Sequence, residues 1–220
     1  MGDPIRILVA DDHTLVRQGY LVLLKAQPDF VIVGEAGDGQ EVVKLAGKLS
    51  PDVIIMDIGM PILNGMEAAR QIKKDNPKVK IVFLSMHTDQ AYIYQSLLAG
   101  ASGYLIKQGA AKELIDAIRA SIAGNIYLSP LISQQVVESY LTNQKAAQAV
   151  ETASPLTTRE RQILQMIAEG LTAKEIASQL NISLKTVDAH RSNIMSKLQI
   201  NNLPGLVKYA LQQRIISLDE

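Results

Sequence analysis

The first 124 residues alternate five times between short apolar runs and amphipathic stretches, and this alternation restricts the fold more than any other feature of the chain. The apolar runs are rich in Val and Ile, as buried parallel strands are. They are Ile5 to Ala10, Phe30 to Val33, Val53 to Met56, Val79 to Leu84 and Tyr104 to Ile106. The stretches between them place apolar residues at helical spacing, for example Leu15, Gly19, Val22 and Leu23. The pattern predicts an α/β fold with a doubly wound, five-stranded parallel sheet.

Ionisable residues follow three of these runs. Asp11 and Asp12 follow the first run, Asp57 closes the third, and Lys107 follows the fifth. Ligands of such sheets lie beyond the carboxyl ends of the strands, so we expect three carboxylates and one ammonium to converge there. A hard cation such as Mg2+ prefers oxygen ligands, which favours Asp12 and Asp57 as its ligands beside a phosphoryl group. The chain contains no Cys, which excludes thiolate zinc sites and disulfides.

Each of these residues also has an ordinary explanation. Asp11 or Asp12 would serve equally well as the cap of a following helix, Asp57 as a turn residue, and Lys107 as a solvated strand end. Their joint placement at three strand ends favours a shared site.

Three classes of phosphate-handling enzyme are excluded by spacing. A P-loop requires Ser or Thr after its Lys, but Lys48 is followed by Leu49. A dinucleotide motif requires a third Gly where this chain has Val42. A phosphohydrolase of the haloacid dehalogenase type requires a second Asp where this chain has Thr14.

Taken together, these signals form an ordered motif set over residues 1–124. The set consists of Asp11-Asp12, Asp57 to Gly65, Ser85, and Tyr104 to Lys107. It resembles the receiver domain of bacterial two-component response regulators, which has a flavodoxin-like fold. One departure is Gln108, because many receivers have a cis proline after the Lys. The turn after Lys107 is therefore expected to use an ordinary trans peptide bond.

The resemblance implies a role for each site residue. Asp57 is the phospho-acceptor, which takes a phosphoryl group from the phosphohistidine of a sensor histidine kinase. Asp12, Asp57 and the Gly59 carbonyl bind Mg2+, with Asp11 near the ion through water. Lys107 pairs with the phosphoryl oxygens, and Ser85 and Tyr104 form the switch that responds to them. Apart from Mg2+-dependent self-phosphorylation and self-dephosphorylation, no enzymatic activity is implied.

The chain changes character after residue 124. Residues 125–154 are expected to be a linker with one helix from Pro130 to Leu141, because the stretch from Thr142 to Ser154 has little to bury. Residues 155–220 read as a small all-α domain of four helices. Thr157 and Glu160 fit a capping box, and Ser183 fits the cap of the third helix. The short turn before Ser183 indicates a helix-turn-helix.

The third of these helices has two distinct faces. Val187, Ile194 and Leu198 are expected to be its buried stripe, whereas Lys185, Ala189, Ser192 and Ser196 recur on another face. Residues 155–215 resemble the LuxR-type helix-turn-helix of NarL/FixJ response regulators. Candidate phosphate contacts, which set register and affinity, are Lys174, Lys185, Thr186, His190, Arg191 and Lys197. Candidate base readers are Asp188, Ala189 and Ser192.

The expected partner of this module is double-stranded promoter DNA. Residues 155–220 carry 8 Lys+Arg against 6 Asp+Glu, a balance of +2, which permits such a partner without establishing it. One recognition helix makes too few contacts for tight binding, so a homodimer is expected on phosphorylation or on DNA. The last helix, with Leu203, Leu206, Val207 and Leu211, has more apolar surface than its core needs. The open alternative is a helical module that docks a protein partner instead of DNA.

The predicted location is the cytoplasm, without a membrane partner. No apolar run approaches the roughly 18 residues of a membrane span. The first residues, Met1 to Pro4, lack the basic-then-apolar plan of a signal peptide.

Overall fold

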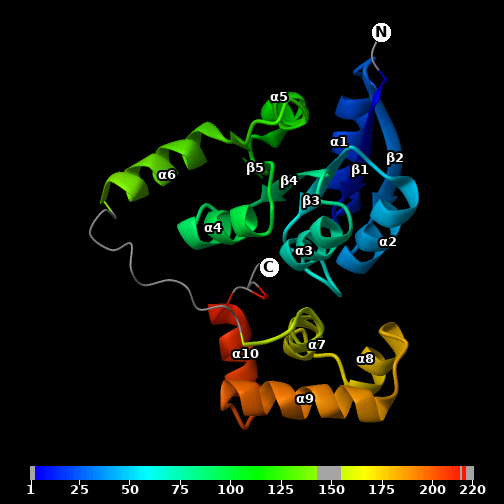
Figure 1. Ribbon diagram of the computed structural model, residues 1–220, viewed down its shortest axis with the longest axis vertical. Helices are drawn as coiled ribbons and strands as arrows, with labels where there is room; N and C mark the ends of the chain where they lie inside the picture. The colour runs from blue at the N-terminus through cyan, green and yellow to red at the C-terminus, as the bar shows by residue number, and fades with distance from the viewer. Residues whose placement is uncertain (1–2, 143–154, 214, 217–220) are drawn as a thin grey trace. The chain divides into compact units, whose positions relative to one another are not determined.

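The computed structural model describes residues 3–142, 155–213 and 215–216 of the chain. The chain divides into two compact units, Met1–Ala149 and Val150–Glu220. Among the described residues, all strands belong to the first unit, and the second unit contains only helices (Figure 1). The α/β and all-α fold classes expected from the sequence are therefore confirmed.

The strands of the first unit form one parallel sheet in the order β2-β1-β3-β4-β5-β6. They are β1 (Ile5–Ala10), β2 (Phe30–Ala36), β3 (Val53–Asp57), β4 (Lys80–Ser85), β5 (Gly103–Ile106) and β6 (Tyr127–Leu128). The predicted sheet of five strands is thus corrected to six among the described residues. The added edge strand is held by the Tyr127 amide, which donates to the Ser102 carbonyl at 3.0 Å. A strand of two residues is too short to produce a periodic signal in the sequence.

Helices cover both faces of this sheet, as a doubly wound fold requires. They are α1 (Thr14–Lys25), α2 (Gly39–Leu49), α3 (Gly65–Asp75), α4 (Gln90–Leu98), α5 (Ala110–Ile122) and α6 (Pro130–Thr142). Successive side chains of a strand point to opposite faces. Leu8 and Ile54 accordingly pack with α2 and α3, whereas Ile7 and Ile55 pack with α1 and α5. The sheet is therefore buried on both faces. The polar residues gather at the carboxyl ends of its strands.

The helix α1 forms where the helical spacing predicted a helix, but the residues that it buries are not those of that spacing. Tyr20, Leu21 and Leu24 are its buried residues. Leu15 and Val22, two of the residues at helical spacing, are 86% and 70% exposed. Because α1 carries apolar residues on more than one face, helical spacing alone matches two stripes. Packing against β2 and α5 selects between them.

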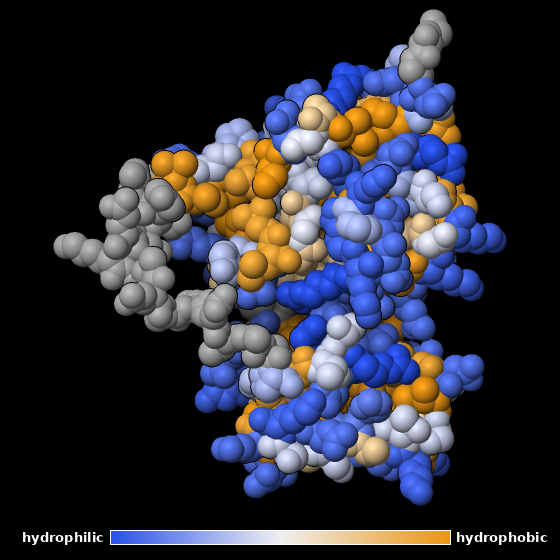
Figure 2. Space-filling view, viewed as in Figure 1, coloured by the Kyte–Doolittle hydropathy of each residue, from blue (hydrophilic) through white to orange (hydrophobic). Residues whose placement is uncertain are grey.

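Apolar side chains also remain on the surface over α4 and α6 (Figure 2). Tyr94 and Leu98 of α4 and Leu131 and Val137 of α6 are all exposed. Contiguous apolar surface of this kind marks interaction sites in many proteins. None of the helices in the described part of the chain combines the length and apolar character that a membrane span requires.

The region between the two sequence modules is partly ordered. β6 extends the sheet, and Ile132 of α6 is fully buried in the core beside α3 and α4. The predicted helix from Pro130 to Leu141 corresponds to α6. Residues 143–154, most of the predicted linker, lie outside the described residues. The division into residues 1–124, 125–154 and 155–220 stays a prediction.

The second unit consists of α7 (Thr158–Ala168), α8 (Ala173–Gln179), α9 (Leu184–Leu198) and α10 (Leu203–Gln212). Thr157 and Glu160 form the predicted capping box of α7. Ser183 caps α9, since its hydroxyl accepts the Thr186 amide at 3.1 Å. A second capping box, of Thr172 and Glu175, begins α8. These local hydrogen bonds fix where α8 and α9 begin, and the short turn between the two helices gives the helix-turn-helix arrangement.

The core of the second unit tests two expectations about apolar faces. Val187 and Ile194 of α9 are buried and Leu198 is half-buried against the same core, which confirms the predicted stripe. In α10 the expectation of spare apolar surface holds for Leu203, which is 44% exposed, but not for Leu206, which is fully buried. The surface that α10 offers to a partner is therefore narrower than the sequence pattern indicates.

Candidate functional site

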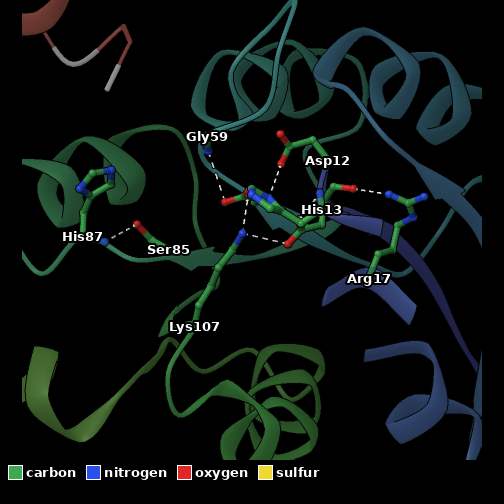
Figure 3. Close-up of polar contacts among 9 residues, drawn as sticks. Asp12, His13, Arg17, Gly59, Ser85, His87 and Lys107 are labelled. Carbon is green, nitrogen blue, oxygen red and sulfur yellow. Dashed lines mark hydrogen bonds and ion pairs between the residues drawn. The ribbon is translucent and has the colours of Figure 1, made fainter. Parts of the chain in front are cut away.

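Lys107 joins two carboxylates at the carboxyl edge of the sheet (Figure 3). Its Nζ lies 2.7 Å from Asp57 Oδ2, at the end of β3, and 3.0 Å from Asp11 Oδ2, just after β1. The Asp11 side chain is fully buried and that of Asp57 is 7% exposed. The parallel strands β1, β3 and β5 thus bring together groups that are up to 96 residues apart, as their positions after the strands predicted.

Asp12 and His13 complete this cluster from the start of α1. The Asp12 side chain is 31% exposed, and its Oδ1 lies 2.8 Å from His13 Nδ1. Ligand atoms of Asp11, Asp12, His13 and Asp57 all lie within 4.8 Å of one another. His13 was missed by the sequence reasoning, although its place directly after Asp12 was a signal. Neither Asp11 nor Asp12 is the N-cap of α1, which was the alternative explanation for these residues. The N-cap is His13, and its side chain makes no capping hydrogen bond.

Backbone geometry holds the loop after Asp57 close to the site. The Gly65 amide donates to the Ile58 carbonyl at 2.9 Å, which closes the loop. A Cβ at Gly65 would lie 2.0 Å from the Asp57 carbonyl oxygen, so only glycine fits this close approach. Ile62 has a φ of 69°, a strained value for a β-branched residue. The Gly59 amide donates to Asp57 Oδ1 at 3.3 Å.

Arg17 supports the other side of the cluster. Its guanidinium donates a short hydrogen bond to the Asp11 carbonyl and lies 3.3 Å from Glu35 Oε2. Because these contacts tie α1 and β2 to the loop after β1, Arg17 restrains the loop that carries Asp11 and Asp12.

Burial and charge act against each other in this cluster. Burial raises the pKa of the Asp57 carboxyl, and the nearby Lys107 ammonium offsets this only in part. Burial alone would lower the pKa of Lys107, but the attraction of Asp57 and Asp11 raises it above its usual value. Lys107 therefore stays a cation beside the Asp57 carboxylate. Because burial makes the negative charge of Asp57 unfavourable, binding of a further cation would stabilise it.

The oxygen set suits a hard divalent cation. Asp11 Oδ2 and Asp12 Oδ1 are buried atoms that lie at ion-pair distance from Lys107 and His13 respectively. Three carboxylates then face a single lysine and one imidazole. Carboxylate oxygens with open positions are the ligands that Mg2+ takes in phosphate-handling sites. The residues present therefore fit the metal that the sequence led us to expect.

Ser85 and Tyr104 meet the same short segment after β4. The Ser85 hydroxyl accepts the His87 amide at 3.0 Å, and the Tyr104 hydroxyl donates to the His87 carbonyl at 2.9 Å. Tyr104 is fully buried. The His87 ring stacks on Tyr92 of α4, with ring centroids 4.0 Å apart. The two predicted switch residues thus hold one loop from both sides.

The turn that presents Lys107 is made without proline. Every peptide bond in the described part of the chain is trans, including the one between Lys107 and Gln108. The Lys107 amide donates to the Ser85 carbonyl at 2.9 Å, and the Gly109 amide to the Ile106 carbonyl at 3.0 Å. These two bonds fix the turn, as the departure at Gln108 required.

The candidate DNA face lies on α9. Asp188, Ala189 and Ser192, the predicted base readers, are all exposed. Among the predicted phosphate contacts, Lys185 and Arg191 of α9 and Lys174 of α8 are exposed, and His190 of α9 is half-buried. The face is thus open to a ligand and carries net positive charge from Lys and Arg.

Two of the predicted phosphate contacts also have partners inside the unit. Lys197 Nζ lies 2.7 Å from Glu160 Oε2, which ties α9 to the cap of α7. The Thr186 hydroxyl lies 2.8 Å from the Ser183 hydroxyl at the helix cap. These contacts were not foreseen, because they depend on how the helices pack.

Two family models match the chain one after the other. The response regulator receiver domain matches residues 7–119, which contain the acidic cluster. The luxR family of bacterial regulatory proteins matches residues 154–210, which contain α7 to α9 and most of α10. The chain belongs to the luxR-family response regulators.

Relatives and solved structures agree with this assignment. The transcriptional regulatory protein LiaR of Bacillus subtilis (strain 168) is 41% identical over 213 residues, 97% of this chain and 100% of the relative. A solved RcsB–DNA complex is 27% identical with a TM-score of 0.60, over 96% of this chain and 99% of RcsB. A structure of two RcsB dimers on two parallel DNAs is 28% identical with a TM-score of 0.60, again over 96% and 99%.

This response regulator is therefore a transcription regulator with a receiver domain and a DNA-binding domain, and not a classical enzyme. Membership of the family implies a sensor kinase as its partner. The roles of the individual residues in the two sites stay predictions.

Proposed function

We propose that this response regulator accepts a phosphoryl group on Asp57 from the phosphohistidine of a sensor histidine kinase. A bond forms between an Asp57 carboxylate oxygen and phosphorus while the bond from phosphorus to the kinase nitrogen breaks. The observation that carries the proposal is Lys107, whose Nζ lies 2.7 Å from Asp57 and 3.0 Å from Asp11 at the edge of the sheet. The ammonium of Lys107 is a compact point charge, which suits it to pair with a negatively charged phosphoryl oxygen.

Mg2+ would be held by Asp12, Asp57 and the Gly59 carbonyl, with Asp11 nearby. When bound, the ion neutralises the charge that develops on the phosphoryl oxygens. The support is the set of carboxylate oxygens described above, which outnumber the cations around them. Mg2+-dependent self-phosphorylation from a small donor and self-dephosphorylation belong to this proposal.

Ser85 and Tyr104 would respond to phosphorylation of Asp57 and transmit it to the loop after β4. A phosphoryl group brings roughly −1.5 to −2 charge and strong acceptor oxygens. The Ser85 hydroxyl, at the end of β4, would respond to this group by exchanging its bond to the His87 amide for one to phosphate. Tyr104 is bonded to the same residue, so both side chains would follow a movement of this loop.

The second unit would bind promoter DNA through α9, with α10 contributing to a dimer. The exposed Asp188, Ala189 and Ser192 would read bases, and the flanking basic residues would contact phosphates. The solved complexes of RcsB with DNA, one of them containing dimers, support this proposal by similarity. A DNA partner would place the protein in the cytoplasm.

The phosphorylation proposal is tested by labelling with a phosphoramidate donor in the presence of Mg2+. Wild type should become labelled and Asp57→Asn should not. The matched control is Asp75→Asn, which removes an exposed carboxylate at the end of α3. Equal labelling of Asp57→Asn and wild type would refute Asp57 as the acceptor.

The DNA proposal is tested against the protein-docking alternative by gel shift with genomic fragments at increasing salt. Neutralising phosphates makes DNA affinity fall steeply as salt rises. Absence of any shift at low salt, with the protein phosphorylated, would favour the protein partner.

A further inference from the structure

The imidazole of His13 is the only nitrogen ligand in the cluster at the sheet edge, among the described residues. A nitrogen of its ring lies within 4.8 Å of carboxylate oxygens of Asp11, Asp12 and Asp57. Its Nδ1 lies 2.8 Å from Asp12 Oδ1 and 3.4 Å from Asp11 Oδ1 (Figure 3). The ring is therefore already turned toward the carboxylates.

His13 has the backbone position that makes this orientation stable. It is the N-cap residue of α1, with extended backbone angles of −81° and 98°. Its amide donates to Asp11 Oδ1 at 2.8 Å, so the backbone of His13 is tied to the cluster as well. The side chain is 65% exposed, which leaves it free to adjust toward an incoming ion.

The donor set decides which ions a site prefers. Carboxylates and carbonyls suit Mg2+ and Mn2+, whereas imidazole suits Zn2+ and other later transition metals. Mg2+ sites built from carboxylates alone gain little from a nearby imidazole. A site that contains both kinds of donor gains affinity mainly for the transition metals.

We propose that His13 is a nitrogen donor to the divalent ion at this site and gives the site an affinity for Zn2+ that the carboxylates alone would not supply. This inference rests on the metal site of the proposed function. It assigns to His13 the choice between ions, whereas Asp12 and Asp57 would bind each of them. Transition metals would then compete with Mg2+ for the site that serves phosphorylation.

The test is calorimetric titration of the full chain with Mg2+, Mn2+ and Zn2+, for wild type and His13→Asn. The substitution removes the imidazole and keeps a polar side chain at an exposed N-cap, where Asn is favoured. Loss of a residue that supports a metal ligand typically lowers metal affinity roughly 10- to 100-fold. The Zn2+ affinity of His13→Asn should fall by at least this factor, whereas its Mg2+ affinity should change little.

The matched control is His87→Asn, which removes an imidazole after β4 that is not part of the cluster. It should keep the Zn2+ affinity of wild type. A second readout is pulsed electron paramagnetic resonance of bound Mn2+, in which wild type should show coupling to an imidazole nitrogen. His13→Asn should lose this coupling.

The results separate the two levels of inference. Equal Zn2+ affinity of wild type and His13→Asn, without nitrogen coupling in wild type, would overturn the role of His13. Unchanged Mg2+ affinity in Asp12→Asn and Asp57→Asn would instead overturn the metal site of the proposed function. Loss of Zn2+ affinity in His13→Asn alone supports the inference.

Discussion

Asp57 is a residue whose charge opposes folding. Burial raises the pKa of its carboxyl above the usual value of 3.8, and Lys107 compensates only in part. A group whose pKa is raised in the folded state binds its proton more tightly there than in the unfolded chain. Free energy of unfolding is therefore lost as the pH rises through the folded pKa, and the loss is complete above that pKa.

Asp57→Asn should consequently be more stable than wild type at neutral pH and without divalent ions. The expected gain is the roughly 0.5–2 kcal/mol of a single stabilising substitution. It should shrink as the pH falls below 3.8, where Asp57 is protonated in both the folded and the unfolded state. Denaturant titrations across this range measure it. A gain that is independent of pH would show that charge is not its cause.

Lys185 on α9 is expected to act through its charge alone. Lys185→Ala should weaken DNA binding about equally across sequences and reduce the salt slope by roughly one unit, as loss of a phosphate contact does. Binding isotherms at several salt concentrations, on operator and unrelated DNA, measure both effects. A loss confined to one base position would make Lys185 a base reader.

Asp188 is expected to act through a base. It is exposed on α9, and a carboxylate there can accept a hydrogen bond from cytosine N4. Asp188→Ala should relax the preference at one base pair by about 1–3 kcal/mol. Selection of binding sites from random DNA measures this preference. An unchanged preference would leave Asp188 with only an electrostatic role near the start of the helix.

At the scale of the elements, the Glu160–Lys197 pair couples α9 to α7. Burial raises the pKa of Glu160, but bonds from Lys197 and Thr157 outweigh it, so the pKa is lowered overall. Stability from Glu160 is thus present above its usual pKa of 4.5 and lost as the pH falls through the folded value. Because Lys197 is 39% exposed, solvent weakens the pair.

Lys197→Met should therefore lower the protection of α7 and α9 amides from hydrogen exchange by a modest free energy, about 0.2–1 kcal/mol. Glu160→Ala should cost more, because it also breaks the capping box with Thr157. The two losses should be less than additive in the double variant. Full additivity, measured by residue-resolved exchange at neutral pH, would mean that the 2.7 Å contact contributes no coupling.

At the scale of the whole molecule, phosphorylation is expected to drive dimerisation and, with it, operator binding. Two half-sites about one helical turn apart sum the contacts of two recognition helices. Leu203 on α10 is 44% exposed and available for such pairing, whereas Leu206 is committed to its own core. Sedimentation and footprinting, with and without phosphorylation, test both events. Identical mass and identical protection in the two states would contradict this link.

Leu203→Ser should weaken the dimer on DNA while leaving the fold of the second unit intact. Leu206→Ser is the contrasting variant, because burying a hydroxyl in place of a core side chain should destabilise the unit itself.

Local sequence signals determined a large part of this protein. Strand positions follow from apolar runs, and the starts of α7 and α9 follow from Thr157, Glu160 and Ser183, because a cap and the amides it bonds lie within three residues. The ends of parallel strands share one edge, so the meeting of Asp57 and Lys107 was also predictable.

Only the tertiary structure decided the contacts that depend on packing. The face that α1 buries, the pairing of β6 with β5 and the Glu160–Lys197 pair have no local pattern, because their partners lie far away in sequence. The same holds for the Tyr104 hydroxyl on β5, which donates to the His87 carbonyl after the neighbouring strand β4. His13 is next to Asp12 in the chain, yet its role depends on a ring orientation that the assembled sheet edge provides. A periodic pattern shows which residues of one segment lie on the same face. The contacts named above depend instead on how different segments pack against one another.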